Sequence, residues 1–391
     1  MLTALPQDIE FIVYEYMNYN IGIDFKMDFY ERHLDKLDWD QISFNEFIPV
    51  SFFERHVDKL MWSGISYNEA VPTWFFEKHI DDLNWSSISW NKSISIEFYE
   101  KHLNELDWCG IYGNESKHLG ASEFYKKYIF KVNWEYISRN ESVPIEFFEK
   151  HIDKVNWYWL SGNKSIPAAF YEKYINKVDW NQVCYNNLPF EFYKKYIDKV
   201  NWIGLSQSKT IPIAFFEQYV DKLDWTGISK NRQIPIAFYE KHIDNVNWVW
   251  LSGNESVPIA FYEKHIDKLD WKAISRNQSI PVAFYEKHIH KVHWPSICAN
   301  ESISVAFFEK YIHKVEWECI SYNESVPVEF FEKYIDKLHW SGISYNESIP
   351  LWFYEKYIDK LDWWSISGNE SIPKQIKVKE VKERQTASSL S

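Results

Sequence analysis

The chain has 391 residues, of which 19% are aromatic and 25% charged, and its formal net charge is -13. This length suits two or three globular domains or one long repeat array. The acidic balance argues against a nucleic-acid partner, because phosphate binding needs a basic face. No stretch approaches the roughly 18 unbroken apolar residues of a membrane-spanning helix, so we expect no membrane association.

The four cysteines indicate a reducing compartment. They are widely separated and contain no CxxC pair, so the chain has no disulfide framework. The first residues include Asp8 and Glu10 and lack the basic start of a signal peptide. We therefore expect an intracellular protein.

In chain order, residues 1–29 come first, and we predict that they form a helical cap on the first repeat. Part of this segment resembles the first helix of an F-box, L-P-x-[DE]-I-x-x-x-[IV]-x-x-[YF]-[LM]. The matching residues are Leu5, Pro6, Asp8, Ile9, Val13, Tyr16 and Met17. The resemblance implies one alternative function, that of a substrate adaptor for a ubiquitin ligase.

Residues 30–373 consist of repeats. Fifteen tryptophans follow one another at intervals of 23 residues, except for one interval of 26 (108–134) and one of 22 (180–202). A fixed period of this size is typical of a solenoid, in which each unit is completed by its neighbours. The tryptophans are Trp39, Trp62, Trp85, Trp108, Trp134, Trp157, Trp180, Trp202, Trp225, Trp248, Trp271, Trp294, Trp317, Trp340 and Trp363.

The repeat unit reads W-x-x-[IL]-S-x-N-x-S-[IV]-P-x-x-F-[FY]-E-K-[HY]-I-D-K-[LV]-[DN]. After the proline, apolar residues recur at helical spacing, which predicts a helix of about a dozen residues. In the unit that starts at Trp157 these residues are Phe170, Tyr171, Tyr174, Ile175 and Val178.

A shorter helical turn begins at each tryptophan. Asp179 can cap the turn that starts at Trp180, and Val183 lies three residues on, on the same side. We expect the following asparagine to end the turn in the left-handed conformation. The fold class is therefore an all-α solenoid of about fifteen repeats, each one helix plus a short helical turn. The alternative is a leucine-rich-repeat-like horseshoe.

The recurring residues are predicted to be structural. We assign the tryptophans to the core, with Trp157, Trp180, Trp225, Trp248 and Trp271 as examples. The asparagine six residues after each tryptophan, as in Asn163 and Asn254, is predicted to satisfy loop backbone groups of neighbouring repeats. It is replaced only by Ser208. Ten of these asparagines belong to N-x-S sequons, which we interpret as structural and not as glycan sites.

No position is predicted to be catalytic or to hold a cofactor or metal. A histidine column (His33, His56, His79, His102, His151, His242, His265, His288) alternates with tyrosine, so we interpret it as planar rings at a helix boundary. No carboxylate pair differs from its counterparts in the other repeats, as a general acid and base would have to. We expect that the protein is not an enzyme.

The candidate partner surface lies where the repeats differ. Positions one, two and five after each tryptophan vary too much in size to face a shared core, and many are aromatic. Exposed aromatics are enriched at protein interfaces. The candidate residues are Tyr67, Trp90, Trp159, Trp250, Tyr322, Tyr345 and Trp364.

Two features interrupt or end the array. The repeats at 108–134 and 180–202 have an insertion and a deletion, and we expect a local bulge or kink there. Residues 374–391 turn charged and then small and polar, which predicts a disordered tail.

The repeat resembles the short tryptophan-containing repeats that giant nucleocytoplasmic DNA viruses encode, which run D-K-[IV]-D-W-x-x-L-S-x-N-P-x-A-I-x-x-L-E-K. The likeness covers residues 30–373; this chain departs by placing Ser-Ile between the asparagine and the proline. The family implies a viral protein in the host cytoplasm, or a virion structural component, and brings no established activity. We expect a non-catalytic scaffold for protein–protein interaction, with no prediction of its oligomeric state. The residues that carry the likeness are Asp153, Lys154, Val155, Asn156, Trp157, Leu160, Ser161, Asn163, Pro167, Glu172 and Lys173.

Overall fold

The computed structural model describes residues 27–114 and 123–375. These residues contain the thirty α-helices α2 to α31, a further helical segment over 371–375, and no β-strand. The predicted all-α solenoid is therefore confirmed, and the horseshoe alternative is excluded for the described residues because that fold needs a strand in every repeat. The chain divides into two compact units, residues 1–105 with 327–391 (unit 1) and residues 106–326 (unit 2).

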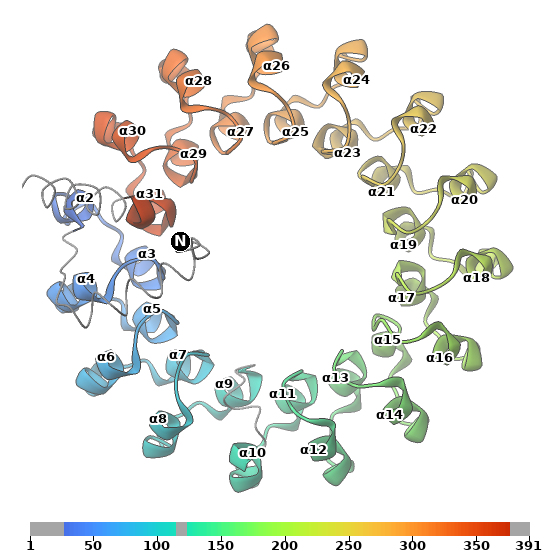
Figure 1. Ribbon diagram of the computed structural model, residues 1–391, viewed down its shortest axis with the longest axis horizontal. Helices are drawn as coiled ribbons and strands as arrows, with labels where there is room; N and C mark the ends of the chain where they lie inside the picture. Colours follow the sequence, from blue (N-terminus) through green and yellow to red (C-terminus); the bar gives the residue numbers. More distant parts are fainter. Residues whose placement is uncertain (1–26, 115–122, 376–391) are drawn as a thin grey trace, which may run out of the picture. The chain divides into compact units, whose positions relative to one another are not determined.

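Each repeat consists of two short helices. We call the helix that begins at the repeat tryptophan the Trp helix, and the helix that contains the F-[FY]-E-K sequence the Phe helix. Within each unit the Trp helices form one row and the Phe helices a second (Figure 1).

In unit 1 the Trp helices are α3 (Trp39–Phe44), α5 (Trp62–Tyr67), α7 (Trp85–Trp90), α29 (Trp340–Tyr345) and α31 (Trp363–Gly368). The Phe helices of this unit are α2 (Asp28–Glu31), α4 (Val50–Arg55), α6 (Thr73–Lys78), α8 (Ile96–Lys101), α28 (Val328–Lys333) and α30 (Leu351–Lys356).

In unit 2 the Trp helices are α9 (Trp108–Gly113), α11 (Trp134–Arg139), α13 (Trp157–Gly162), α15 (Trp180–Val183), α17 (Trp202–Gln207), α19 (Trp225–Lys230), α21 (Trp248–Ser252), α23 (Trp271–Arg276), α25 (Trp294–Cys298) and α27 (Trp317–Ser321). The Phe helices of this unit are α10 (Glu123–Lys127), α12 (Ile145–Lys150), α14 (Ala168–Lys173), α16 (Phe190–Lys195), α18 (Ile213–Gln218), α20 (Ile236–Lys241), α22 (Ile259–Lys264), α24 (Val282–Lys287) and α26 (Val305–Lys310).

The Trp helices begin as the sequence predicts but end differently. The Asp179 carboxylate accepts hydrogen bonds from the backbone N–H groups of Asn181 and Gln182 at the start of α15. At the end of α13, Asn163 has φ -74° and ψ 116°, an extended conformation and not the left-handed one that we expected. The prediction was wrong because the asparagine stops the helix with its side-chain amide, which bonds to the neighbouring repeat.

The Phe helices are shorter than predicted. α14 contains six residues and ends at Lys173, because the next residue, Tyr174, has φ -118° and ψ 31°, outside the helical region. The Tyr174 ring packs on Phe170 and Trp157, with centroids 4.9 Å and 5.7 Å away. The chain then turns and brings Val178 into the core. This turn is a 3-10 helix in seven described repeats: η1 (Val57–Lys59), η2 (Ile80–Asp82), η3 (Ile129–Lys131), η4 (Val220–Lys222), η5 (Ile312–Lys314), η6 (Ile335–Lys337) and η7 (Ile358–Lys360).

The repeat tryptophans lie at the margin of the core. In the repeat of α13 and α14, Leu160, Ile166, Phe170 and Tyr171 are buried, whereas Trp157 is half-buried. The same holds for the other four tryptophans that we assigned to the core, Trp180, Trp225, Trp248 and Trp271. Each indole is the first residue of its helix. It stacks one face on the phenylalanine of its own repeat, and for the Trp157 pair the centroids are 6.0 Å apart.

Side-chain amides and hydroxyls join successive repeats, as predicted. The buried Asn163 amide donates to the carbonyl oxygens of Ser138 (3.1 Å) and Asn140 (3.2 Å) in the preceding repeat. Its Oδ1 atom accepts from the backbone N–H of Ser165 (2.9 Å). The Ser138 hydroxyl accepts from the backbone N–H of Asn156 (2.9 Å) in the next repeat. These asparagines are sequon residues whose amides are buried, which supports the structural interpretation of the sequons.

The one repeat without this asparagine has a substitute. Ser208 occupies the position, and its hydroxyl lies 3.0 Å from the Thr210 hydroxyl. The Thr210 hydroxyl in turn donates to the Leu188 carbonyl of the preceding repeat (3.2 Å). The connection between the two repeats is therefore kept by a different pair of side chains.

The deletion in residues 180–202 falls in the loop after the asparagine, since Asn186 and Pro189 are three residues apart whereas Asn163 and Pro167 are four apart. α15 has four residues in place of six, and Asn186 still donates to the Ser161 carbonyl (2.8 Å). The repeat thus keeps its connection to its neighbour. Most of the insertion in residues 108–134 lies outside the described residues, and so do residues 1–26 with the F-box-like sequence and residues 376–391 of the tail.

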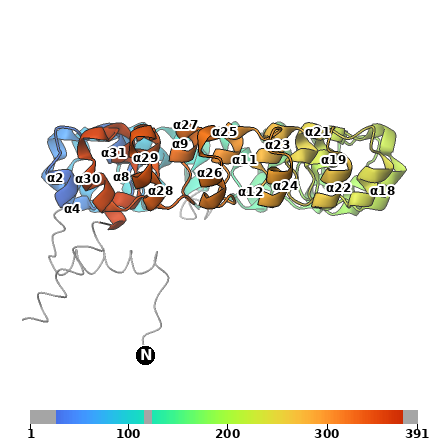
Figure 2. The same ribbon diagram turned by 90° about the horizontal axis from the view of Figure 1, so that it is seen from above.

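Unit 1 contains a repeat that is split between the two ends of the chain. The last Trp helix, α31, pairs with α2, the first described Phe helix (Figures 1 and 2). The ring centroids of Trp363 and Phe29 are 6.0 Å apart at 22°, and those of Trp39 and Phe52, which lie in one repeat, are 6.0 Å apart at 12°. The Tyr30 hydroxyl also donates to the Ile366 carbonyl.

The split repeat also stacks on its neighbour through the usual contacts. Asn45 donates to the carbonyls of Ser367 (3.3 Å) and Asn369 (3.4 Å), just as Asn68 donates to those of Ser43 and Asn45. The segment 27–29 is therefore part of a repeat and not of the cap that the sequence predicts over 1–29. At the other end, Gln375 accepts a hydrogen bond from the Leu351 backbone N–H (2.6 Å), so the first residues of the predicted tail are packed on α30.

Candidate protein-binding surface

The variable positions of the Trp helices are on the outside of their row. Counting the repeat tryptophan as position zero, position five is the last residue of a six-residue Trp helix, and position one lies one turn before it on the same side. Tyr67 and Tyr345 at position five are 48% and 55% exposed, and Trp364 at position one is 55% exposed. Trp250 and Tyr322 are also exposed, whereas Trp90 and Trp159 are half-buried.

Unit 1 brings four of the seven candidate residues into one row. The order of contacting Trp helices is α29, α31, α3, α5 and α7, because α31 packs against α3. Tyr345 and Trp364 are thereby placed in line with Tyr67 and Trp90, from which they are separated by more than 250 residues of sequence. The sequence period does not predict this proximity, because it relates only repeats that are adjacent in the sequence.

Phe44 completes this row and was missing from the sequence-based candidates. It is the position-five residue of α3, is 48% exposed, and has its ring centroid 6.4 Å from that of Tyr67. The position rule that selected Tyr67 would have found it. We call Tyr345, Trp364, Phe44, Tyr67 and Trp90 the aromatic row.

The candidates in unit 2 are partly engaged by the chain itself. The Lys230 ammonium lies 3.7 Å from the centroid of Trp250, and the Arg139 guanidinium lies 5.4 Å from that of Trp159. In both cases a cation at position five of one Trp helix covers an aromatic ring at position two of the next. Trp159 and Trp250 therefore stabilise the stack through cation–π contacts. Tyr322, the third candidate in unit 2, lies directly after the last residue of α27.

An acidic row accompanies the aromatic row in unit 1. Position seven, two residues beyond position five, is glutamate in four successive stacked repeats and lysine in the fifth. All five side chains belong to exposed residues. In stacking order they are Glu347, Glu370, Glu46, Glu69 and Lys92; we call the four glutamates the acidic row.

The two buried cysteines of the repeats accept structural hydrogen bonds. Cys184 and Cys298 replace the serine at position four, and their Sγ atoms accept the backbone N–H groups of Asn201 (3.2 Å) and Glu316 (3.4 Å). Burial raises the pKa of the Cys184 thiol to about 11 and that of Cys298 to about 12. Both thiols are therefore protonated at neutral pH, the form that is a poor nucleophile.

The histidine column lies at the ends of the Phe helices, as predicted. His151 follows α12 and packs on Phe147 and Trp134, with centroids 5.0 Å and 5.6 Å away. Burial lowers the pKa of His151, His265 and His288, and neighbouring lysines lower it further. Over the described ranges, no three His, Cys, Asp or Glu side chains are grouped so that they could hold a metal ion.

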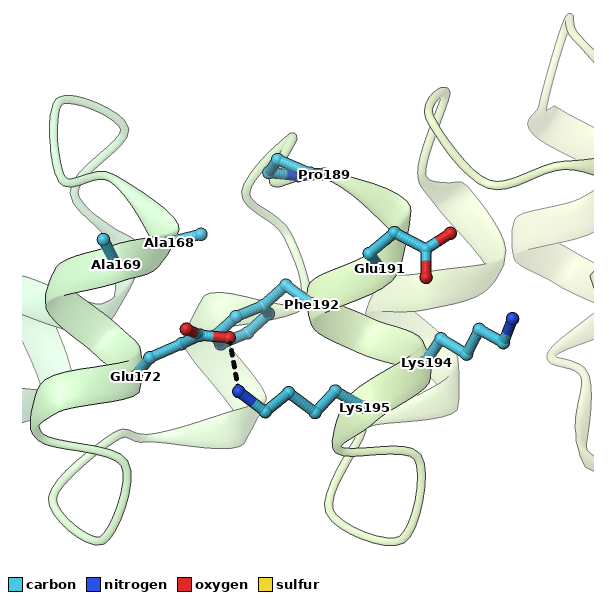
Figure 3. Close-up of a pocket in the computed structure, with 8 residues that line it drawn as sticks. All are labelled: Ala168, Ala169, Glu172, Pro189, Glu191, Phe192, Lys194 and Lys195. Carbon is cyan, nitrogen blue, oxygen red and sulfur yellow. Dashed lines mark hydrogen bonds and ion pairs between the residues drawn. The ribbon is translucent and has the colours of Figure 1, made fainter.

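One surface hollow lies between two Phe helices of unit 2. It has a volume of about 600 Å³ and forms where Ala168 of α14 replaces the larger isoleucine or valine found at this position in most repeats (Figure 3). Its rim includes the ion pair between Glu172 and Lys195 (3.0 Å). The side chains around it offer no arrangement of acid, base and nucleophile.

Comparison with known proteins finds no matching family model, no matching curated protein and no matching solved structure. Among the helices that the structure describes, none is both long and apolar enough to cross a membrane.

Proposed function

We propose that this protein is a non-catalytic repeat scaffold that binds a protein partner through the aromatic row of unit 1. The observation that carries the proposal is the alignment of aromatic side chains from α29, α31, α3, α5 and α7 on one face, including Phe44 and Tyr67 at 48% exposure each. Aromatic side chains contribute much of the binding energy at protein interfaces, because they bury a large area at a small cost in rotamer entropy.

The second support is that the recurring and the variable positions of each repeat have different roles. The recurring positions form the core or make hydrogen bonds between repeats, as Asn163 does. The chain therefore presents a regular framework with variable surface positions, which is the way repeat proteins build extended binding surfaces. From the resemblance to viral repeats we infer that the partner is a protein of the infected cell or of the virus.

The test is affinity capture with the full-length protein and matched variants. The variant Phe44→Ser, Tyr67→Ser and Trp364→Ser removes three exposed rings of the row. The control Trp352→Ser removes a ring that is 46% exposed on the Phe helix α30 of the same unit. We expect a protein that the wild type and the control retain and that the triple variant loses at least about tenfold. Equal retention by all three proteins would overturn the proposal.

A further inference from the structure

We infer that the partner presents a basic segment, with arginine or lysine side chains that insert between the aromatic row and the acidic row of unit 1. This inference rests on the proposed function and specifies the chemistry of the partner. It depends on what the two rows have in common: neighbouring repeats place residues of the same kind side by side.

Neighbours in the acidic row have like charge, whereas one pair of neighbours at position seven in unit 2 has opposite charges. In unit 2, Arg232 and Glu255 occupy position seven of successive repeats, and their side chains form an ion pair at 2.8 Å. Position seven is thus within ion-pair distance of its counterpart in the next repeat. In unit 1 the corresponding neighbours Glu46 and Glu69 are both acidic, and so are Glu347 and Glu370. Like charges at this spacing repel, and added cations relieve the repulsion.

The contact between α31 and α3 makes this row continuous. Glu370 precedes Glu46 in the stack only because α31 packs against α3, where Asn45 donates to the carbonyls of Ser367 and Asn369. Four carboxylates thereby follow one another along one edge of unit 1. A row of negative charge repels an acidic peptide or a nucleic acid and attracts a basic segment.

The chain itself shows how a cation fits between acidic and aromatic groups on this face. The Lys374 ammonium lies 3.9 Å from a carboxylate oxygen of Glu370 and 3.7 Å from the ring centroid of Phe47. Phe47 is at position eight and lies outside the aromatic row. At Tyr67 and Glu69, a ring of the aromatic row and a carboxylate of the acidic row lie two residues apart in one repeat. A cation that contacts both gains a cation–π interaction and an ion pair at once.

The spacing of the rows defines the segment. Packed helices lie about 8–10 Å apart, and a polyproline II segment rises about 3.1 Å per residue with three residues per turn. Every third side chain of such a segment lies on one face at intervals of about 9 Å, so basic side chains at these positions would meet successive repeats. Four glutamates correspond to a segment of about ten residues with four such side chains, one of which would share Glu370 with Lys374.

Fluorescence anisotropy with the full-length protein and a labelled ten-residue peptide tests the inference. The probe has arginine at positions one, four, seven and ten, with glycine and serine between them, and the reference peptide has glutamine in place of arginine. We expect the arginine peptide to bind in a salt-dependent manner and the glutamine peptide to bind at least about tenfold more weakly. Equal binding of the two peptides would overturn the inference.

Matched variants locate the binding. Glu46→Gln with Glu69→Gln should weaken the arginine peptide about fivefold to tenfold, since two exposed ion pairs are lost. Phe44→Ser with Tyr67→Ser should weaken it by a similar factor. The control Asp58→Asn with Asp81→Asn changes the net charge equally, on the exposed turns that follow two Phe helices of unit 1, and should leave binding unchanged. An equal loss in the control would show diffuse attraction and overturn the inference.

The two proposals fail in different ways. If the aromatic row captures a partner but the arginine peptide does not bind, the proposed function stands and the basic segment is wrong. If the peptide binds but no captured protein depends on the row, the proposed function is overturned.

Discussion

The asparagine at position six holds neighbouring repeats in register. Its amide donates to two carbonyls of the preceding repeat, while its oxygen accepts the backbone N–H of its own loop, as in Asn163. An amide has two donors and a carbonyl acceptor, so one side chain satisfies buried backbone groups on both sides of the junction. A hydroxyl alone lacks the second donor, which explains why Ser208 needs the help of Thr210.

Replacement of Asn163 by alanine should lower the free energy of unfolding by about 3 kcal/mol, because it leaves buried backbone carbonyls without donors. Chemical denaturation followed by circular dichroism measures this loss. The control Lys164→Ala changes the adjacent exposed residue and should cost less than about 0.5 kcal/mol.

The double variant Asn163→Ser with Ser165→Thr copies the natural pair at Ser208 and Thr210. It should recover part of the stability that Asn163→Ala loses, because the threonine hydroxyl can reach the preceding repeat. A double variant no more stable than Asn163→Ala would contradict the role that we assign to Thr210.

Histidines of the column should make stability depend on pH. Burial lowers the pKa of His265 below its ordinary value of 6.5, and its Nε2 atom has no hydrogen-bond partner among the described residues. The unfolded chain then binds this proton more readily than the folded protein does. Stability is therefore full above about pH 6.5 and declines as the pH falls below it.

The variant His151→Tyr, His265→Tyr and His288→Tyr should lose less stability between pH 8 and pH 5 than the wild type. Tyrosine occupies this position in seven other repeats, so the substitution fits the site. Thermal unfolding at the two pH values measures the difference. An unchanged difference between the two pH values would contradict the prediction.

At the scale of elements, no helix of the repeat is long enough to be stable alone. A Trp helix or a Phe helix has at most six residues, as in α13 and α14, whereas isolated helices below about 12 residues are marginal in water. Their stability must come from packing between helices. The four-residue α2 is the extreme case, since Phe29 and Tyr30 are buried against α31.

Phe29→Ala should therefore destabilise the protein as much as Phe52→Ala, by about 3–5 kcal/mol each. The two residues occupy the same position and stack on Trp363 and Trp39 with the same centroid distance of 6.0 Å. Denaturant titration compares them directly. If the start of the chain were merely frayed, Phe29→Ala would cost far less than Phe52→Ala.

At the scale of the whole molecule, segments far apart in the sequence complete one repeat of unit 1, in which the Phe helix α2 pairs with the Trp helix α31. Arg32, which follows α2, pairs with Glu355 of α30 at 3.1 Å. This ion pair repeats the one between Arg55 and Glu31, which lie in consecutive repeats. Neighbours at the junction are joined without a peptide bond between them, by the contacts used everywhere else in the unit.

A circular permutant should consequently fold. Linking residue 375 to residue 27 and opening the exposed turn between Asp244 and Asn245 leaves the helices α2 to α31 intact. We expect its unfolding free energy to stay within about 3 kcal/mol of the wild type, because α2 and α31 already pack in one repeat. The matched control opens the chain between Phe170 and Tyr171, within α14 and its buried core, and should not fold.

Most features of the repeat could be predicted from the sequence, but fewer of its structural details could. Local rules of spacing and capping predict the period, the helix starts and the hydrogen-bonding role of the asparagine. Asp179 caps its helix and Asn163 bonds to the preceding repeat, as these rules predict. The predicted length of the Phe helix failed at Tyr174, because packing of its ring against Trp157 and Phe170 ends the helix. Burial of Trp157 was overestimated, since a residue that starts a helix at the edge of a repeat keeps part of its ring in water.

The candidate surface was predicted by position but not by arrangement. Variability identified Tyr67 and Tyr345 as exposed, yet nothing in the period distinguishes them from Trp250, which Lys230 covers. Their placement in one row requires the contact between α31 and α3.

The sequence by itself determined the all-helical repeat, because a fixed interval of 23 residues forces every unit to bury the same face against the next one. Only the tertiary structure decided which repeats meet at the ends. Periodicity describes contacts between neighbours along the chain, whereas the pairing of Phe29 with Trp363 joins residues at opposite ends of it. The fold brings these together because α2 and α31 are the two halves of one repeat.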